Sequence, residues 1–169
     1  MKRISLIATG GTIACVPTEN GLSPELNAED LVNLVGCGSD EVSIDCTDLF
    51  SMDSSNIQPE EWCLIANAVR EKAGSCDGIV LTHGTDTMAY TASMLSFMLS
   101  GLPVPLVLTG AQYPAVYPNS DGRRNLIDAV TAATVLPGGV YICFGGSVIL
   151  GCRAVKTRTT SLNAFESIN

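Results

Sequence analysis

The chain has 169 residues, of which 46% are hydrophobic, and a formal net charge of −8. This length suits one compact domain with a substantial core, and the acidic balance, without a basic stripe, argues against nucleic-acid binding. Charged residues make up only 15% of the chain, against about 25% in an average soluble domain. We therefore expect another domain or subunit to cover part of the surface.

The sequence predicts neither a membrane span nor a secretory leader. No segment approaches the roughly 18 apolar residues of a transmembrane helix. Met1-Lys2-Arg3 followed by the apolar run Ile4–Ala8 has the charge order of a secretory signal, but the run is shorter than the roughly 7–15 residues that such a signal needs. It leads into a glycine-rich turn, so we interpret it as the first strand.

Seven cysteines are scattered along the chain without a C-x-x-C pair. An odd and dispersed set fits neither a disulfide framework nor a zinc site. We interpret the cysteines as small buried thiols in a reducing cytoplasm, with a redox or metal role as the less favoured alternative.

Four expected strands each run into a short cluster of glycine and hydroxyl residues. They are Ile4–Ala8, Gly78–Leu81, Pro105–Leu108 and Val140–Cys143. Continuous apolar strands separated by helical stretches predict an α/β fold, with a doubly wound, mostly parallel sheet between two helical layers, as in Rossmann-like domains. Because ligands bind beyond the carboxyl ends of such strands, we expect an active site along that edge of the sheet.

The segments between these strands carry helix and turn signals. Asn27 is a helix-capping residue type, Pro59 suits a first helical turn, and Gly74 and Gly101 mark helix ends. The polar stretch Pro17–Pro24 is expected to be a surface loop long enough to act as a lid. The other expected elements are helices over residues 27–35, 59–74, 86–100 and 123–134, a strand over 42–50, and an irregular β-like tail over 148–160.

The first cluster, Thr9-Gly10-Gly11-Thr12, places a hydroxyl at a strand end beside two glycines. Glycines let a substrate approach the main chain and leave N–H groups to stabilise an oxyanion. A threonine hydroxyl is a poor nucleophile until a base activates it. The structural alternative is a tight turn in which Thr12 only bonds neighbouring backbone, and neither phosphate-binding glycine spacing is present.

The second cluster, His83-Gly84-Thr85-Asp86-Thr87, lies where a strand meets a helix. Capping of that helix by Thr85 or Asp86 is the structural alternative, although a cap requires neither the preceding histidine and glycine nor two flanking hydroxyls. His83 is the only histidine, and we interpret it as structural rather than as a general base. Lys156 follows a mostly apolar stretch and is a candidate proton acceptor if it lies near Asp86, with a solvated surface charge as the alternative.

Two segments, Thr9–Ala14 and His83–Met88, together resemble the signature segments of the bacterial-type L-asparaginase family in both order and spacing. Supporting similarity extends the resemblance over essentially the whole chain, in Met52–Ser55, Thr109–Gln112, Ser120–Asn125, Arg153–Lys156 and Thr159–Asn169. The resemblance implies hydrolysis of asparagine to aspartate and ammonia through a covalent acyl-enzyme, with no metal and no cofactor. The absence of a leader and the Asp53-Ser54-Ser55 sequence are similar to the cytoplasmic subgroup.

The resemblance also implies residue roles. By position, Thr12 resembles the family's nucleophilic threonine, and Thr85, Asp86 and Lys156 resemble its second catalytic threonine with an aspartate and a lysine. The implied substrate-binding residues are Asp53, Ser54 and Ser55, which hold the α-carboxylate and ammonium groups, together with Gly11, Gly84 and Ala111 at the strand ends.

Two departures from the family pattern bear on activity. The family usually has a tyrosine in the loop after the first motif, whereas Asn20-Gly21-Leu22-Ser23-Pro24 has none, and Ser23 or Thr18 is the candidate substitute. Family members also carry a smaller C-terminal domain, and a neighbouring subunit's copy helps to complete each site. Residues 1–169 are therefore expected to be the N-terminal α/β domain, of low or no activity alone, from a homo-oligomer (dimer or tetramer).

Four other functions stay open at the level of sequence. An ammonia-releasing amidotransferase subunit uses the same motifs, but usually with extra N-terminal sequence. A slightly larger pocket would permit glutaminase activity. A non-catalytic amino-acid-binding module is the alternative outside enzymes, and a nucleotide-binding domain is disfavoured by the missing phosphate-loop spacing.

Overall fold

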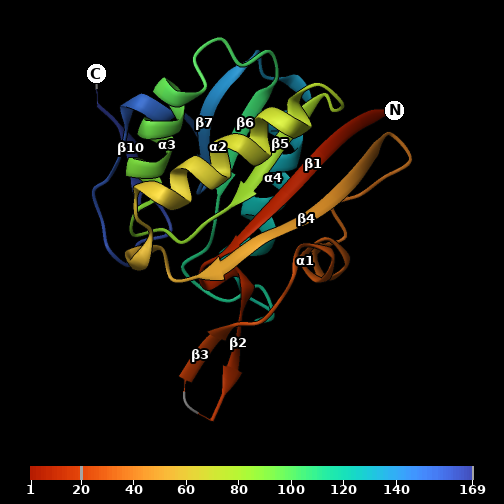
Figure 1. The fold of residues 1–169 in the computed structure, drawn as a ribbon. Coiled ribbons are helices and arrows are strands. Elements are labelled where there is room, and N and C mark those ends of the chain that lie inside the picture. The colour runs from red at the N-terminus through yellow and green to blue at the C-terminus, as the bar shows by residue number, and fades with distance from the viewer. Residues whose placement is uncertain (20, 169) are drawn as a thin grey trace.

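The computed structural model describes residues 1–19 and 21–168 and contains a central six-stranded sheet (Figure 1). The strand order is β4-β1-β5-β6-β7-β8, in which the first five strands are parallel and β8 runs antiparallel to β7. The bounds are β1 Lys2–Gly10, β4 Val42–Met52, β5 Gly78–Thr82, β6 Pro105–Thr109, β7 Gly139–Phe144 and β8 Ser147–Leu150. The expected mostly parallel sheet is confirmed.

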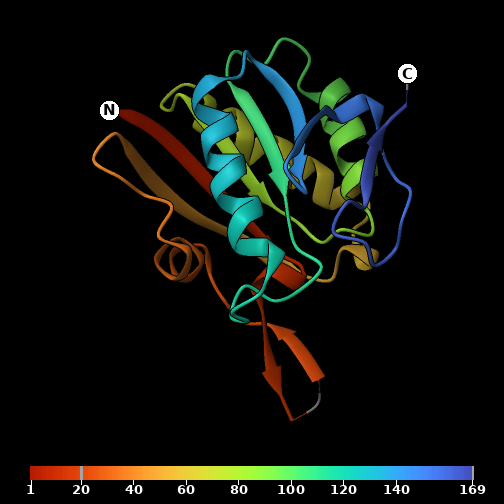
Figure 2. The same cartoon turned by 180° about the vertical axis from the view of Figure 1, so that it is seen from behind.

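Helices cover both faces of the sheet. Helices α2 (Pro59–Ala73) and α3 (Met88–Met98) lie on the face shown in Figure 1, and α1 (Ala28–Val35) and α4 (Asp121–Val135) lie on the opposite face, seen in Figure 2. Neighbouring strand residues alternate between two buried cores, with Ile7 packed on the α2–α3 side and Leu6 on the α1–α4 side. This alternation explains why the strands are unbroken apolar runs, and it confirms the doubly wound three-layer fold.

Helix ends follow the expected capping chemistry. Asn27 accepts a hydrogen bond from the Asp30 N–H, and the Asp30 carboxylate accepts one from the Asn27 N–H, so α1 begins with a reciprocal capping box. Pro59 occupies the first turn of α2, where no N–H is needed. Helix α3 is shorter than the expected residues 86–100, because it begins only at Met88 and ends at Met98, with Leu99 rather than Gly101 as its C-cap.

The stretch 17–24 is not a loop. Strand β2 (Cys15–Thr18) pairs antiparallel with β3 (Gly21–Pro24), and this hairpin projects from the body of the domain (Figure 2). The Thr18 hydroxyl donates to the Gly21 carbonyl at 2.8 Å across the turn. The part of the expected loop that falls on Asn20, and the chain end at Asn169, lie outside the described residues.

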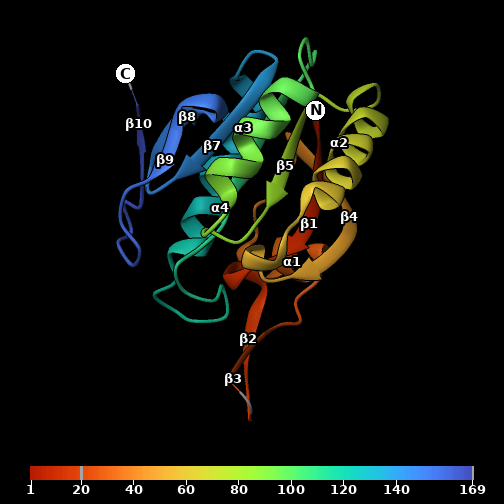
Figure 3. The ribbon, with the colours of Figure 1, turned by 60° about the vertical axis from the view of Figure 1, so that its left-hand side comes forward.

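The last part of the described chain forms a second small ribbon. Strand β9 (Ala154–Lys156) pairs antiparallel with β10 (Phe165–Ser167) beyond β8, as Figure 3 shows. Single 3-10 turns occur at η1 (Thr12–Ala14), η2 (Ser54–Asn56) and η3 (Gly151–Arg153). No helix within residues 1–19 and 21–168 combines the length and apolar character needed to cross a membrane.

The cysteines only partly match the expectation of buried thiols. All seven are free, and Cys15 and Cys143 are buried, but Cys63 and Cys152 are exposed. Cys63 lies on α2 and Cys152 in η3; Cys63 is two positions before the buried Ile65, which places it on the opposite side of the helix. In the described residues, no group of three or more histidine, cysteine or acidic side chains is placed to hold a metal ion.

Candidate active site

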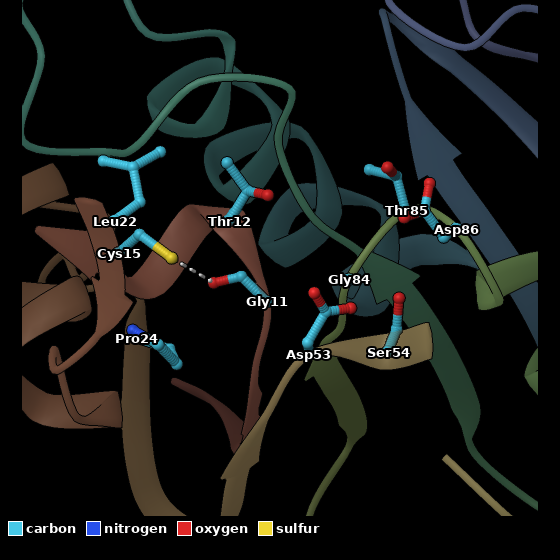
Figure 4. A pocket seen from close by; sticks show the side chains of 10 residues that line it. All are labelled: Gly11, Thr12, Cys15, Leu22, Pro24, Asp53, Ser54, Gly84, Thr85 and Asp86. Carbon is cyan, nitrogen blue, oxygen red and sulfur yellow. Dashed lines mark hydrogen bonds between the residues drawn. The ribbon is translucent and has the colours of Figure 1, made fainter. Parts of the chain in front are cut away.

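A pocket of about 300 Å³ opens where β1 and β5 end, at the sheet edge that the strand pattern indicates (Figure 4). The two clusters of glycine and hydroxyl residues, Thr9–Thr12 and His83–Thr87, both reach it. Its lining consists of Gly11, Thr12, Cys15, Leu22, Pro24, Asp53, Ser54, Gly84, Thr85 and Asp86. The tertiary structure therefore brings together most of the residues that the sequence selects.

Two glycines let the strand ends approach without side chains between them. Gly11 has a positive φ of 78°, and a Cβ atom there would lie 2.5 Å from the Gly84 nitrogen. A Cβ on Gly84 would lie 2.5 Å from the Ser54 Oγ. The Thr9 hydroxyl donates to the Thr82 carbonyl at 2.7 Å and ties β1 to β5 just behind the pocket. Gly11 and Gly84 are thus needed for close packing at the pocket floor.

Thr12 begins the η1 turn directly after Gly11 and is half-buried. Its hydroxyl makes no hydrogen bond to another group in the part of the chain that the structure describes. In Figure 4 it stands across the pocket from Thr85 and Asp86, with Asp53 between the two sides. The side chain is therefore open to a ligand rather than used within the turn, which disfavours the purely structural interpretation.

Lys156 joins the second cluster from a distant part of the chain. Its Nζ donates to the Thr85 Oγ1 at 2.9 Å and to the Asp86 Oδ1 at 2.7 Å. The lysine side chain is only 14% exposed, whereas that of Asp86 is 63% exposed. The ammonium group is therefore held beneath the pocket rim while the carboxylate faces solvent. This is the proximity on which the candidate role of Lys156 depends.

The β9–β10 ribbon positions Lys156. Lys156 pairs with Phe165 across the ribbon, and the Phe165 ring packs edge-on against Phe144 of β7, with centroids 5.1 Å apart. Gln112 anchors the loop between the two strands, because its Nε2 donates to the Thr159 and Ser161 carbonyls at 3.1 and 3.0 Å. Sequence reasoning quoted Gln112 only as part of a similar segment and missed this role.

Asp53 enters the pocket from the end of β4, where it caps η2. Its Oδ1 accepts hydrogen bonds from the N–H and the hydroxyl of Ser55, both at 2.8 Å. These two bonds, with the backbone bond the larger effect, hold the pKa of the Asp53 carboxyl below its ordinary value. Asp53 and Ser54 line the pocket, whereas Ser55 contacts Asp53 and is not part of the lining.

A Ser55→Ala variant is expected to raise the pKa of Asp53 part of the way back, because the hydroxyl bond is lost and the N–H bond remains. Because the folded-state pKa lies below the unfolded-state pKa, the ionised carboxyl stabilises the fold at pH values above the unfolded-state pKa. This contribution disappears as the pH falls through the folded-state pKa. A carbon-detected NMR titration of the Asp53 carboxyl measures the change. The matched control is Ser75→Ala, because the Ser75 hydroxyl donates to the Lys72 carbonyl. An unchanged Asp53 titration in Ser55→Ala contradicts the assignment.

The remaining candidates lie outside the pocket lining. Ala111 is 1% exposed and packs in the α1–α4 core, so its side chain belongs to the interior. Thr18 and Ser23, the suggested substitutes for the loop tyrosine, are on the hairpin but do not line the pocket. His83 is completely buried and does not line it either, and burial lowers its pKa to about 4. A buried neutral imidazole agrees with a structural role.

The hairpin supplies an apolar wall that sequence reasoning did not select. Leu22 and Pro24 of β3 and Cys15 of β2 line the pocket beside Thr12. The Cys15 thiol donates to the Gly11 carbonyl at 3.5 Å. Burial and the nearby Asp53 carboxylate raise the pKa of this thiol, so it is a weak nucleophile.

Comparison with known proteins places this geometry in a family. Residues 3–169 match the family model described as asparaginase, N-terminal. The chain is 46% identical over 168 residues to an L-asparaginase of Thermococcus kodakarensis, covering 99% of this chain and 51% of that protein. The solved structure of the thermostable L-asparaginase from that organism superposes with a TM-score of 0.94, again with 99% and 51% coverage.

Two further relatives differ in what they are called. The structure of a probable cytoplasmic L-asparaginase from Campylobacter jejuni is 31% identical, with a TM-score of 0.85 and coverage of 99% of this chain and 52% of that one. A glutamyl-tRNA(Gln) amidotransferase subunit of Methanococcus vannielii is 37% identical over 179 residues, covering 100% of this chain and 42% of that protein. The chain thus spans about half the length of these relatives, and it belongs to the asparaginase N-terminal domain family.

Proposed function

We propose that this chain carries the substrate pocket of an L-asparaginase, which hydrolyses L-asparagine to L-aspartate and ammonia. The observation that supports this most directly is the contact of Lys156 with both Thr85 and Asp86. These two residues lie opposite Thr12 in one pocket. The two relatives named L-asparaginase support the same substrate class.

In the proposed mechanism, the Thr12 hydroxyl attacks the side-chain amide carbon of asparagine. The C–N bond breaks, the hydroxyl proton leaves with the amide nitrogen as ammonia, and the acyl group remains on Thr12 as an ester. Water then attacks the ester, returns a proton to the Thr12 oxygen and releases aspartate. Thr85 is the proposed proton carrier, because the bond donated by Lys156 occupies its oxygen and leaves its own proton free for the pocket.

The charges around the pocket suit an amino-acid zwitterion. The carboxylates of Asp53 and Asp86 are placed to attract an α-ammonium group, and Asp53 stays ionised because its pKa is lowered. Ser54 and the glycine-lined backbone offer donors for the α-carboxylate, with Gly11 and Gly84 allowing close approach. The proposed substrate-binding set is therefore Asp53, Ser54, Gly11 and Gly84, with Ser55 acting through Asp53 and Ala111 limited to its backbone.

The second candidate function is ammonia release for an amidotransferase partner. Relatives named as glutamyl-tRNA(Gln) amidotransferase subunits reach 37–39% identity over nearly this whole chain, so the same pocket architecture fits both. A glutaminase reaction is the chemical form of this alternative, because the substrate would be one methylene longer.

The test is ammonia release from asparagine and from glutamine. It compares this chain with a chimera in which the chain replaces the matching half of the Thermococcus kodakarensis relative. We expect the chimera to hydrolyse asparagine and the chain alone to show low or no turnover, because the family completes each site with a further domain. Preference for glutamine in the chimera would favour the amidotransferase alternative.

A Thr12→Ala variant of the chimera is expected to bind asparagine without hydrolysing it, as isothermal calorimetry and the ammonia assay would show together. Thr131→Ala is the matched control, because Thr131 lies exposed on α4 and its hydroxyl bonds the Ile127 carbonyl. Continued turnover in Thr12→Ala would contradict the proposed nucleophile. Binding without turnover in the unmodified chimera would favour an amino-acid-binding module.

We also propose a homo-oligomeric protein in the cytoplasm. Large apolar side chains on the outer face of α3, including Tyr90 at 67% and Phe97 at 74% exposure, agree with the low charge content and support a covered surface. The Campylobacter jejuni relative named as probably cytoplasmic supports the location.

A further inference from the structure

A chain of hydrogen bonds runs from helix α2 to the backbone of the candidate site. The Trp62 Nε1 contacts the Thr91 Oγ1 at 2.9 Å, and the same oxygen lies 3.0 Å from the His83 Nε2. At the other side of the ring, the His83 Nδ1 lies 2.7 Å from the Gly84 carbonyl oxygen. His83 and Thr91 are completely buried, so no solvent completes these contacts.

The chemistry of the two ends determines the direction of every bond. The indole of Trp62 can only donate, and the carbonyl of Gly84 can only accept. His83 must therefore carry its proton on Nδ1, and its Nε2 must accept the hydroxyl proton of Thr91. The hydroxyl oxygen of Thr91 in turn accepts from Trp62. All donors and acceptors in this series of hydrogen bonds are satisfied only with a neutral Nδ1–H imidazole. The low pKa of His83 agrees with this form.

The last group in this series of hydrogen bonds is the peptide between Gly84 and the site residue Thr85. Gly84 and Thr85 share one trans peptide, so anchoring the Gly84 oxygen to the buried ring turns the Thr85 N–H to the opposite side. No group among the described residues accepts a hydrogen bond from that N–H. The His83 backbone is itself held, because its N–H donates to the Thr109 carbonyl at 2.9 Å.

We propose that Trp62, Thr91 and His83 are positioning residues that set the orientation of the Gly84–Thr85 peptide and so hold Thr85 where Lys156 and the pocket require it. The proposal rests on the proposed function for its catalytic meaning, but its structural content does not. Rotation of that peptide would break the bond between His83 and the Gly84 carbonyl. His83 thus acts on the site through the backbone, without touching the ligand.

The single histidine makes the test unambiguous. Long-range ¹H–¹⁵N NMR correlations of the imidazole in the ¹⁵N-labelled chain should show a protonated Nδ1 and an unprotonated Nε2, unchanged from about pH 8 to about pH 5.5, where a free histidine titrates. An Nε2–H tautomer, or a ring that titrates like a free histidine, overturns the proposal.

Variants separate positioning from packing. Thr91→Val keeps the shape and removes the hydroxyl that bonds the His83 Nε2, so the Nε2 chemical shift and the Thr85 amide resonance should both change, while Thr91→Ser should restore both. Trp62→Phe removes the indole N–H and serves if Thr91→Val does not fold. Thr134→Val on α4, where the Thr134 hydroxyl bonds only the Thr131 carbonyl, is the control. An unmoved Thr85 resonance in folded Thr91→Val and Trp62→Phe overturns the proposal.

The kinetic test uses the form of the protein that hydrolyses asparagine. We expect Thr91→Val to lower kcat by about 10-fold to 10²-fold, the scale of a small misplacement of a reacting group, with KM nearly unchanged and Thr91→Ser close to the unmodified protein. Full kcat in a folded Thr91→Val variant whose Nε2 resonance shows the loss of the hydroxyl bond overturns the proposal. Absence of turnover in every form contradicts the proposed function alone, and the NMR comparison then decides the positioning role.

Discussion

A Lys156→Met variant is expected to lose about 10²–10⁴-fold in asparagine turnover, the usual contribution of a positioned proton-handling group. Methionine preserves much of the length and apolar stem but cannot donate to the Thr85 hydroxyl or pair with Asp86, which lie 2.9 and 2.7 Å from the lysine nitrogen. Thr85 would lose the bond that directs its proton into the pocket. The measurement is steady-state ammonia release by the active form.

Lys72→Met is the matched control for this variant. Lys72 also makes a 2.7 Å ion pair, with Asp45, but on α2 and away from the pocket lining. We expect its turnover to stay close to that of the unmodified protein, because an isolated ion pair near the surface contributes little. Equal turnover in Lys156→Met and Lys72→Met, with both proteins folded by circular dichroism, would remove Lys156 from the mechanism.

The second large effect is expected from a single methyl group at the pocket floor. Gly11→Ala introduces a Cβ atom 2.5 Å from the Gly84 nitrogen and 2.7 Å from its Cα, at a residue with φ of 78°. With ψ at 175°, this backbone conformation is one that essentially only glycine adopts, and it costs a side-chain-bearing residue about 1–3 kcal/mol. The contact with backbone, which cannot rotate away, adds about 1–3 kcal/mol or more. Denaturant unfolding should therefore show a loss well above that of backbone strain alone, with loss of ligand binding.

Gly36→Ala is the control at an ordinary left-handed position. Gly36 ends α1 at φ 69° and ψ 38°, and a Cβ there meets nothing within 4 Å. We expect only the strain cost of that region, about 1–2 kcal/mol, at this position. Similar unfolding free energies for the two variants would mean that β1 and β5 are not in close contact at Gly11. A large additional loss in Gly11→Ala reports the approach of the two strand ends together with the more restricted backbone of Gly11, whose ψ is 175°.

The pattern of the sequence predicted the layers and the edge where the site lies. Continuous apolar strands such as Ile4–Ala8 need cover on both faces, so they predict a parallel sheet between helices before any contact is known. Parallel strands end on the same side, so Thr12 and the Thr85–Asp86 pair were expected at one edge. Asn27 and Pro59 likewise predicted helix starts, because capping chemistry is local.

Local pattern did not predict the elements that pairing decides. The residues 17–24 are polar and contain glycine and proline, which favours a loop, yet β2 and β3 pair and bring Leu22 to the pocket. Helix α3 begins at Met88 rather than 86, and Thr87 before it donates to the Ser54 carbonyl at 2.8 Å. In the hairpin the pairing of two neighbouring segments competes with a local preference, and at Thr87 a contact with a distant segment does so.

The sequence by itself determined the fold class, the edge of the sheet that holds the site and most of the residues that reach it, because periodicity and strand-end chemistry are properties of short segments. Only the tertiary structure decided that Lys156 meets Thr85, 71 residues away, and that Trp62 and Thr91 reach Gly84 through His83. Such contacts depend on how the β9–β10 ribbon and the helices α2 and α3 pack around the end of β5. That geometry arises from the sum of the packing and is encoded in no single stretch of the chain.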